Sequence, residues 1–208
     1  MEKERTVESV IELEWPMFRA VNGDDRAECQ ENEPMFRAMR RAQFSVWSEQ
    51  ALLSYRDDLV AAGKEGRNLL RDKYINMMAS TDPELYSRLK RELPEPGEEK
   101  LELVGSIWRI LLAQTRALRL RYPEVGRLGR PLLAADEREG WASVETYEKG
   151  ELLTYSEKTL ALLLQCIRDM EAEGISFAER IQENGVIAGG YASLEEAERD
   201  AARRRTER

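Results

Sequence analysis

Apolar side chains recur three and four positions apart along nearly the whole chain, and this spacing limits the fold to packed α-helices. The clearest example is the segment 99–121, where one helical face carries Leu101, Val104, Trp108, Leu111 and Leu118. No useful length of the chain alternates apolar and polar residues with the period of two that a half-buried strand requires. The sequence therefore predicts an all-α fold.

The periodic segments and the breakers between them predict a single-domain bundle of about seven or eight helices over residues 4–192. Pro16 lies inside the first segment and should bend it, because proline cannot donate a helical hydrogen bond. A single long helix is expected over 143–172, whereas 122–140 and the stretch GVIAGGY (185–191) are expected to be irregular. Residues 193–208 should form a polar, charged helix or tail that its few apolar residues anchor weakly.

Composition excludes several classes of protein. The longest apolar run, Leu160–Leu164, falls far short of the roughly 20 residues of a membrane span. With a net charge of −8 and a dense basic run only at the C-terminus, the chain is not expected to bind nucleic acid. Its first residues, MEKERTVESV, lack the apolar centre of a secretion signal, so the expected location is the cytoplasm, with Cys29 and Cys166 as free thiols.

The sequence contains 0 histidines, and this absence restricts its chemistry further. Haem, zinc and di-iron sites with histidine ligands are excluded, as are nucleophiles activated by histidine. Any reaction must use carboxylates, tyrosines, lysines, arginines or a cysteine. A Mg²⁺ or Mn²⁺ site built from carboxylates alone remains a minor alternative, and no metal ligands are assigned.

Glu14 lies on the apolar stripe of the first helix, in the stretch IELEWPMF. An unpaired carboxylate in a core costs several kcal/mol, so Glu14 must be paired, hydrogen-bonded or protonated. Pro16 leaves the carbonyl of Glu12 without its helical donor. Two interpretations stay open: the bent helix presents an acid and a free acceptor to a cavity, or Glu14 pairs with a core arginine.

A second polar group lies in ETYEKGELLTYS, residues 145–156. Tyr147, Glu151 and Tyr155 are four residues apart, so they share a helical face and bracket a carboxylate with two phenols. This arrangement suits a general acid or base, or a polar ligand site. A surface glutamate flanked by tyrosines explains the spacing equally well.

Further misplaced polar residues occur in two other segments. Arg40 and Gln43 lie between the aromatic residues of the helix over 34–48, where Arg40 could bind an anion or compensate a buried acid. Asp58 shares the inner side of its helix with Tyr55, and Lys73 lies close to the apolar stripe of the next helix. We therefore expect these four residues, together with Tyr147, to bind the same ligand.

Several blocks of the sequence together resemble a known family. These are EWPMF, VNGDDRAECQ, MRRAQFSVW, SYRDDL, GRNLLRDKYINMMASTDP and ETYEKGELLTYS. The chain is similar over about residues 10–192 to an uncharacterised bacterial family, the domain of unknown function numbered 4125. The resemblance implies a self-contained cytoplasmic domain and supplies no activity, cofactor or catalytic residue.

Two functional hypotheses follow. In the first, the protein is a small-molecule binder and an enzyme, with Glu14, Glu151 and Tyr155 as catalytic groups and a polar or anionic metabolite as ligand. In the second, it is a non-catalytic helical interaction or regulatory module, with a homodimer as one form, and the same polar groups are internal ion pairs. The first is favoured because the misplaced polar residues recur in segments that are remote in sequence.

Overall fold

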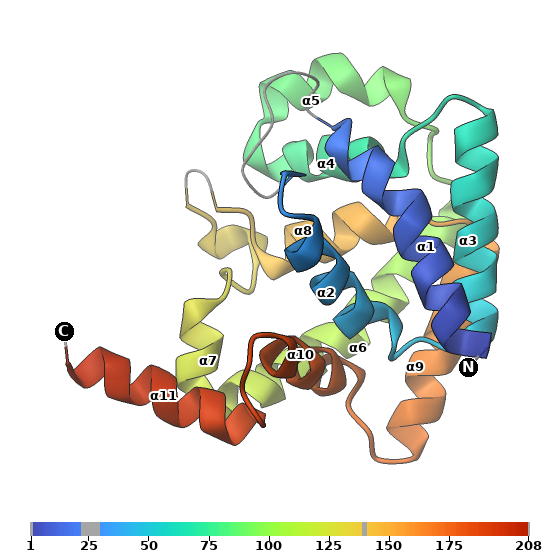
Figure 1. Ribbon diagram of the computed structural model, residues 1–208. Helices are drawn as coiled ribbons and strands as arrows, with labels where there is room; N and C mark the ends of the chain where they lie inside the picture. Colours follow the sequence, from blue (N-terminus) through green and yellow to red (C-terminus); the bar gives the residue numbers. More distant parts are fainter. Residues whose placement is uncertain (1, 22–29, 139–140, 208) are drawn as a thin grey trace.

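The computed structural model describes residues 2–21, 30–138 and 141–207, which fold into a single all-α domain (Figure 1). These ranges contain eleven α-helices, two 3-10 segments and no β-strand. The helices are α1 Glu2–Arg19, α2 Glu33–Phe44, α3 Glu49–Lys64, α4 Leu69–Thr81, α5 Pro83–Leu89, α6 Glu98–Arg121, α7 Pro123–Leu128, α8 Val144–Leu152, α9 Glu157–Ala172, α10 Phe177–Ala188 and α11 Leu194–Thr206. The fold class is as predicted, with more helices than expected.

The main core forms where α1, α3, α6 and α9 pack together, with α2 and α10 covering one side and α4 and α8 another. Its largest fully buried side chains are aromatic: Trp47, Tyr55, Tyr155 and Phe44. The rings of Tyr55 and Tyr155 lie 4.6 Å apart at their centroids in an edge-to-face arrangement, which is favourable for aromatic pairs. Two of these aromatic residues carry hydroxyl groups, so this part of the core needs polar partners.

The expected continuous helix over 143–172 is wrong, because the chain breaks between Leu152 and Glu157. Ser156 adopts extended backbone angles and its side chain accepts a hydrogen bond from the Thr159 amide, which makes it the N-cap of a new helix. The Ser156 amide in turn donates to Asp58 at 3.0 Å. The interruption lets α8 and α9 take separate directions, with Tyr155 buried at their junction.

Two segments expected to be irregular are partly helical. Residues 122–140 contain α7, which Pro123 begins, and the 3-10 segment η3 Ala134–Asp136. The stretch GVIAGGY contributes its first four residues to α10, so only its end is a turn. Both were missed because the helices are short or weakly periodic and are stabilised by their neighbours.

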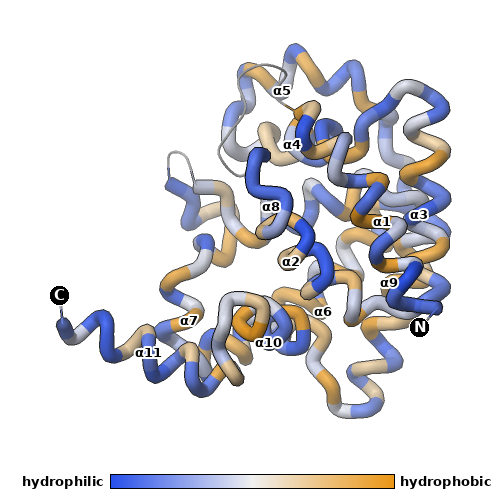
Figure 2. The backbone as a smooth tube through the Cα atoms, viewed as in Figure 1, coloured by the Kyte–Doolittle hydropathy of each residue, from blue (hydrophilic) through white to orange (hydrophobic). Residues whose placement is uncertain are grey.

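The last helix, α11, packs against α7 and is mostly hydrophilic along its length (Figure 2). Leu194 and Ala197 are its buried residues, and Leu194 joins Leu118 and Tyr122 in a small second core. The Glu198 carboxylate accepts from two amides in the first turn of α7, at 3.0 and 2.8 Å. The buried contacts of α11 thus lie in its first two turns, and one ion pair from Arg205 to Glu124 of α7, at 3.5 Å, adds a contact near its C-terminal end, which extends away from the bundle (Figure 1).

Among the described helices, none combines the length and the apolar content needed to cross a bilayer.

Candidate functional site

Glu14 is fully buried in α1, as its place on the apolar stripe predicted. Both of its oxygens accept hydrogen bonds from Arg40 of α2, with Nε to Oε2 at 2.6 Å and Nη2 to Oε1. The Tyr55 hydroxyl of α3 donates to Oε1 at 2.7 Å. A two-pronged guanidinium contact of this kind is the strong form of an ion pair, and it satisfies a carboxylate that water cannot reach.

Arg40 joins Glu14 to a second buried acid, Glu151 of α8. Its Nη1 donates to Glu151 Oε1 at 3.0 Å and to Gln43 Oε1 at 2.7 Å. The guanidinium also lies 4.5 Å from the ring centroid of Phe44. Burial by itself lowers the pKa of Arg40, but the charges of Glu14 and Glu151 outweigh it and raise that pKa well above its usual value.

Glu151 accepts from four different side chains. Besides Arg40, the Gln43 amide donates to Oε1 at 3.1 Å, the Tyr155 hydroxyl donates to Oε1 at 2.7 Å, and Lys73 Nζ donates to Oε2. Burial raises the pKa of Glu151, yet the charges of Arg40 and Lys73 and the hydrogen bonds more than offset it, so the pKa is held far below its usual value. Glu151 therefore stays ionised at neutral pH.

These contacts form one connected set, which we call the polar network: Glu14, Arg40, Gln43, Tyr55, Lys73, Glu151 and Tyr155. Its two carboxylates and two cations balance in charge. Its members come from α1, α2, α3, α4, α8 and the junction before α9, so it ties six parts of the bundle together. No member of the polar network lines either of two pockets on the surface of α1 and its surroundings.

Tyr147 lies at the edge of the polar network and is partly exposed. Lys73 Nζ is 3.4 Å from its ring centroid, and the guanidinium carbon of Arg130 is 5.0 Å away. The ring thus lies close to two cations, which its electron-rich face attracts. Of the eight residues predicted from the sequence to be catalytic or ligand-binding, this arrangement brings together all except one.

The exception is Asp58, which is engaged elsewhere. Its Oδ2 accepts from the Ser156 amide at 3.0 Å and from the Thr159 hydroxyl at 2.6 Å. These contacts cap the first turn of α9, and Asp58 shares none of the hydrogen bonds of the polar network. Its expected role as a ligand contact therefore gains no support from its surroundings.

Glu148 is a further acid beside the polar network, and the sequence reading missed it. It is partly exposed and forms no hydrogen bond or ion pair with the described part of the chain. Burial and the nearby charge of Glu151 raise its pKa to about 7, although Lys73 and Arg40 oppose the rise. The spacing of three residues from Glu148 to Glu151 on one helix was the signal that could have found it.

Other candidate groups are structural or undescribed. Cys166 is buried, its sulfur accepts from the Ser48 amide at 3.2 Å, and burial raises its thiol pKa, which makes it a poor nucleophile. Cys29 lies outside the described residues. Within the described ranges, no group of three or more potential ligands among His, Cys, Asp and Glu could hold a metal ion.

Comparison with known proteins identifies one family. Neither a curated protein nor a solved structure shows significant similarity to the chain. The family described as "Protein of unknown function (DUF4125)" matches residues 4–199, which is nearly the whole chain and includes every member of the polar network. The protein therefore belongs to the DUF4125 family.

Proposed function

We propose that the protein binds a small polar molecule at the exposed edge of the polar network and exchanges a proton with it through Glu148. The observation that carries this proposal is a contrast between neighbouring acids. Glu14 and Glu151 accept hydrogen bonds at every oxygen, whereas Glu148, one helical turn from Glu151, has none from the described residues. A carboxyl group without a partner beside a rigid, saturated network is free to contact a ligand.

The pKa of Glu148 supports an acid-base role. A general acid or base works best when its pKa lies near the operating pH, and that of Glu148 is raised to about 7. The ionised form accepts a proton from the ligand, and the protonated form returns it. In this proposal Glu14, Glu151 and Tyr155, expected to be catalytic, are positioning residues that hold the helix carrying Glu148.

The charge of the site favours a ligand with hydroxyl or amine groups. Arg40 uses four of its N–H donors within the polar network, through Nε, Nη2 and both donors of Nη1. A guanidinium has five donors in all, so little of Arg40 is left for an anion. Since the polar network is neutral, ionised Glu148 adds one negative charge, and an uncharged or cationic group complements it better than an anion does.

The test is a thermal-shift screen of hydroxyl- and amine-bearing metabolites near pH 7, on the wild type and on Glu148→Gln. A ligand that binds only the folded form at one hundred times its Kd stabilises it by about 2.7 kcal/mol, a shift of roughly 5–10 °C in a domain of this size. Glu102→Gln is the matched control, because Glu102 is an exposed acid on α6. The proposal fails if the hits stabilise Glu148→Gln as much as the wild type and the control.

A non-catalytic interaction module is the second candidate function. The observation in its favour is the outer face of α2, where Met35 and Met39 are 57% and 51% exposed. Flexible methionine side chains suit surfaces that adapt to a partner. If this face makes a homodimer, light scattering should show a dimer for the wild type and a monomer after Met35→Lys with Met39→Lys.

We further propose that the protein acts in the bacterial cytoplasm, because its sequence blocks resemble those of a bacterial family.

A further inference from the structure

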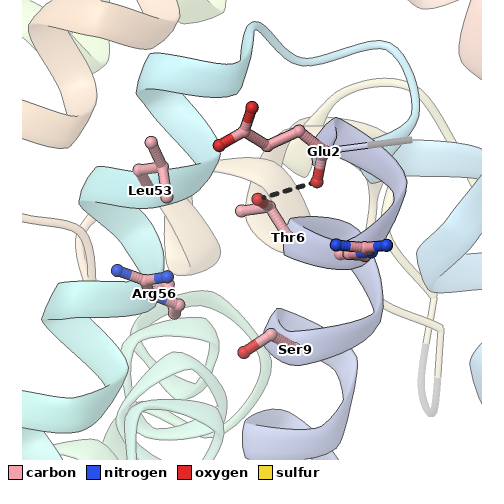
Figure 3. A pocket seen from close by; sticks show the side chains of 6 residues that line it. Glu2, Thr6, Ser9, Leu53 and Arg56 are labelled. Carbon is pink, nitrogen blue, oxygen red and sulfur yellow. Dashed lines mark hydrogen bonds between the residues drawn. The ribbon is translucent and has the colours of Figure 1, made fainter.

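A groove lies on the surface of the bundle, between the first half of α1 and the neighbouring part of α3 (Figure 3). It has a volume of about 750 Å³, within the range of small-molecule sites. The residues that line it are Glu2, Arg5, Thr6 and Ser9 of α1 and Leu53 and Arg56 of α3. We call it the α1–α3 groove. None of these residues belongs to the polar network or contacts Glu148.

Two arginines line this groove, Arg5 on α1 and Arg56 on α3. Arg5 makes no ion pair or hydrogen bond with the described residues. Arg56 forms one ion pair, from its Nη2 to Oδ1 of the neighbouring Asp57 at 3.2 Å. The Asp57 side chain is 63% exposed. An exposed pair of that kind contributes little to stability, so Arg56 can readily exchange it for another partner. Nearly all donors of both arginines are therefore available.

The remaining lining residues define what else a ligand would meet. The Ser9 hydroxyl has no hydrogen-bond partner among the described residues and can donate to an acceptor in the groove. The Thr6 hydroxyl is already bonded to the Glu2 carbonyl at 3.2 Å (Figure 3). Leu53 supplies an apolar wall. With two arginines and one glutamate, the lining carries one net positive charge.

We propose that the α1–α3 groove binds the oxyanion of a small molecule, a carboxylate or a phosphate, between Arg5 and Arg56. Guanidinium groups match both anions because their planar donors form paired hydrogen bonds to two oxygens. Ser9 adds a neutral donor, and Leu53 contacts the carbon skeleton of the ligand. The site is separate from the proposed reaction at Glu148, so either proposal can fail without the other.

A nuclear magnetic resonance titration of the full chain tests this site, with inorganic phosphate and succinate as separate probes. We expect saturating shifts of the Nε–Hε signals of Arg5 and Arg56 with at least one probe, and the probe that saturates identifies the anion. Arg5→Gln and Arg56→Gln should each raise Kd about tenfold or more, as the loss of a charged hydrogen bond does. Glu2→Gln should lower Kd, because it removes the opposing charge.

Sodium chloride at matched ionic strength and the Arg180→Gln variant are the controls. Arg180 is an exposed arginine of α10 that pairs with Glu183 at 2.7 Å, far from the groove in sequence and on another helix. The inference is overturned if, with both probes, the chemical shifts of these signals still change linearly at a probe concentration of about 10 mM, which is tenfold above a weak millimolar Kd. Saturation that persists unchanged in a variant lacking both groove arginines would overturn it equally.

Discussion

Replacing Arg40 by methionine removes the cation that joins the two buried carboxylates of the polar network. In the wild type Arg40 donates to Glu14 at 2.6 Å and to Glu151 at 3.0 Å, and the side chains of all three are 0–8% exposed. Glu151 keeps Lys73 after the substitution, but Glu14 keeps only the Tyr55 hydroxyl. The variant must therefore bury a carboxylate without a cation or protonate it.

The expected loss is about 3–5 kcal/mol of unfolding free energy, which is typical when one partner of a buried ion pair is removed. Arg41→Met is the matched control, one residue away on α2. Arg41 pairs with Glu8 at 2.8 Å with side chains that are 49% and 40% exposed, so its loss should lower the free energy by no more than about 1 kcal/mol. The two variants alter the same type of side chain on one helix.

Urea unfolding followed by far-ultraviolet circular dichroism measures both effects. For a denaturant slope of about 2–3 kcal/mol/M, the midpoint of Arg40→Met should fall by roughly 1–2 M. Adding Glu14→Gln to Arg40→Met should restore part of the loss, because the uncompensated charge is then gone. Equal midpoints for Arg40→Met and Arg41→Met would refute the claim that the polar network stabilises the fold through buried charge pairing.

Three further predictions concern Glu148, Gly150 and Asp58. The pKa of Glu148 is raised to about 7 from 4.5, so its protonation stabilises the fold fully below about pH 4.5, and this contribution is lost as pH rises through 7. Glu148→Gln should therefore need more urea to unfold than the wild type at pH 8, with a gain of at most about 3 kcal/mol in unfolding free energy. At pH 4.5 the two proteins should unfold at similar urea concentrations. Gly150→Ala should lower the melting temperature through a loss of about 1–3 kcal/mol of unfolding free energy, because the added methyl group would lie 2.8 Å from Met77 Cγ. In the control Gly185→Ala, in α10, the methyl group meets nothing within 4 Å, and the melting temperature should rise. A higher melting temperature for Gly150→Ala would contradict the packing described. Asp58→Ala should lower the unfolding free energy by about 1–2 kcal/mol, because α9 loses the hydrogen bonds that Asp58 accepts at its first turn. The pH dependence of stability that arises from Glu148 should not change. A changed pH dependence would show that Asp58 and the polar network are coupled.

Helices with a regular apolar stripe and clear caps were predictable from the sequence. The expected helix over 99–121 is observed as α6 Glu98–Arg121. Ser48 caps α3 by accepting from the Ala51 amide. Such features depend on residues within one or two turns of each other, which is the range over which a sequence pattern is informative.

The break between α8 and α9 was not predictable from periodicity, because apolar residues continue across it. The Ser156 cap is reinforced by Asp58, which is 98 residues away in the chain. The short helix α7 likewise depends on Glu198, 74 residues from Glu124, for the hydrogen bonds at its start. In both cases a contact between distant segments decides the local structure.

The candidate site divides in the same way. The positions of Glu14 and Arg40 on apolar stripes indicated that both would be buried and would need partners, and both are buried. Which partners they find was open, since Arg40 and Glu151 are 111 residues apart. For Glu148 the sequence offered only its spacing of three residues from Glu151, because the burial that raises its pKa depends on the tertiary structure.

By itself, the sequence determined that this chain is all-helical, that histidine plays no part in its chemistry, and that several charged residues must lie among apolar ones. Only the tertiary structure decided that Glu14, Arg40, Glu151 and Lys73 neutralise one another, that Asp58 caps a helix instead, and that Glu148 is left without a partner among the described residues. The physical reason is that helical periodicity is a local property, whereas the pairing of buried charges depends on how helices from the whole chain pack.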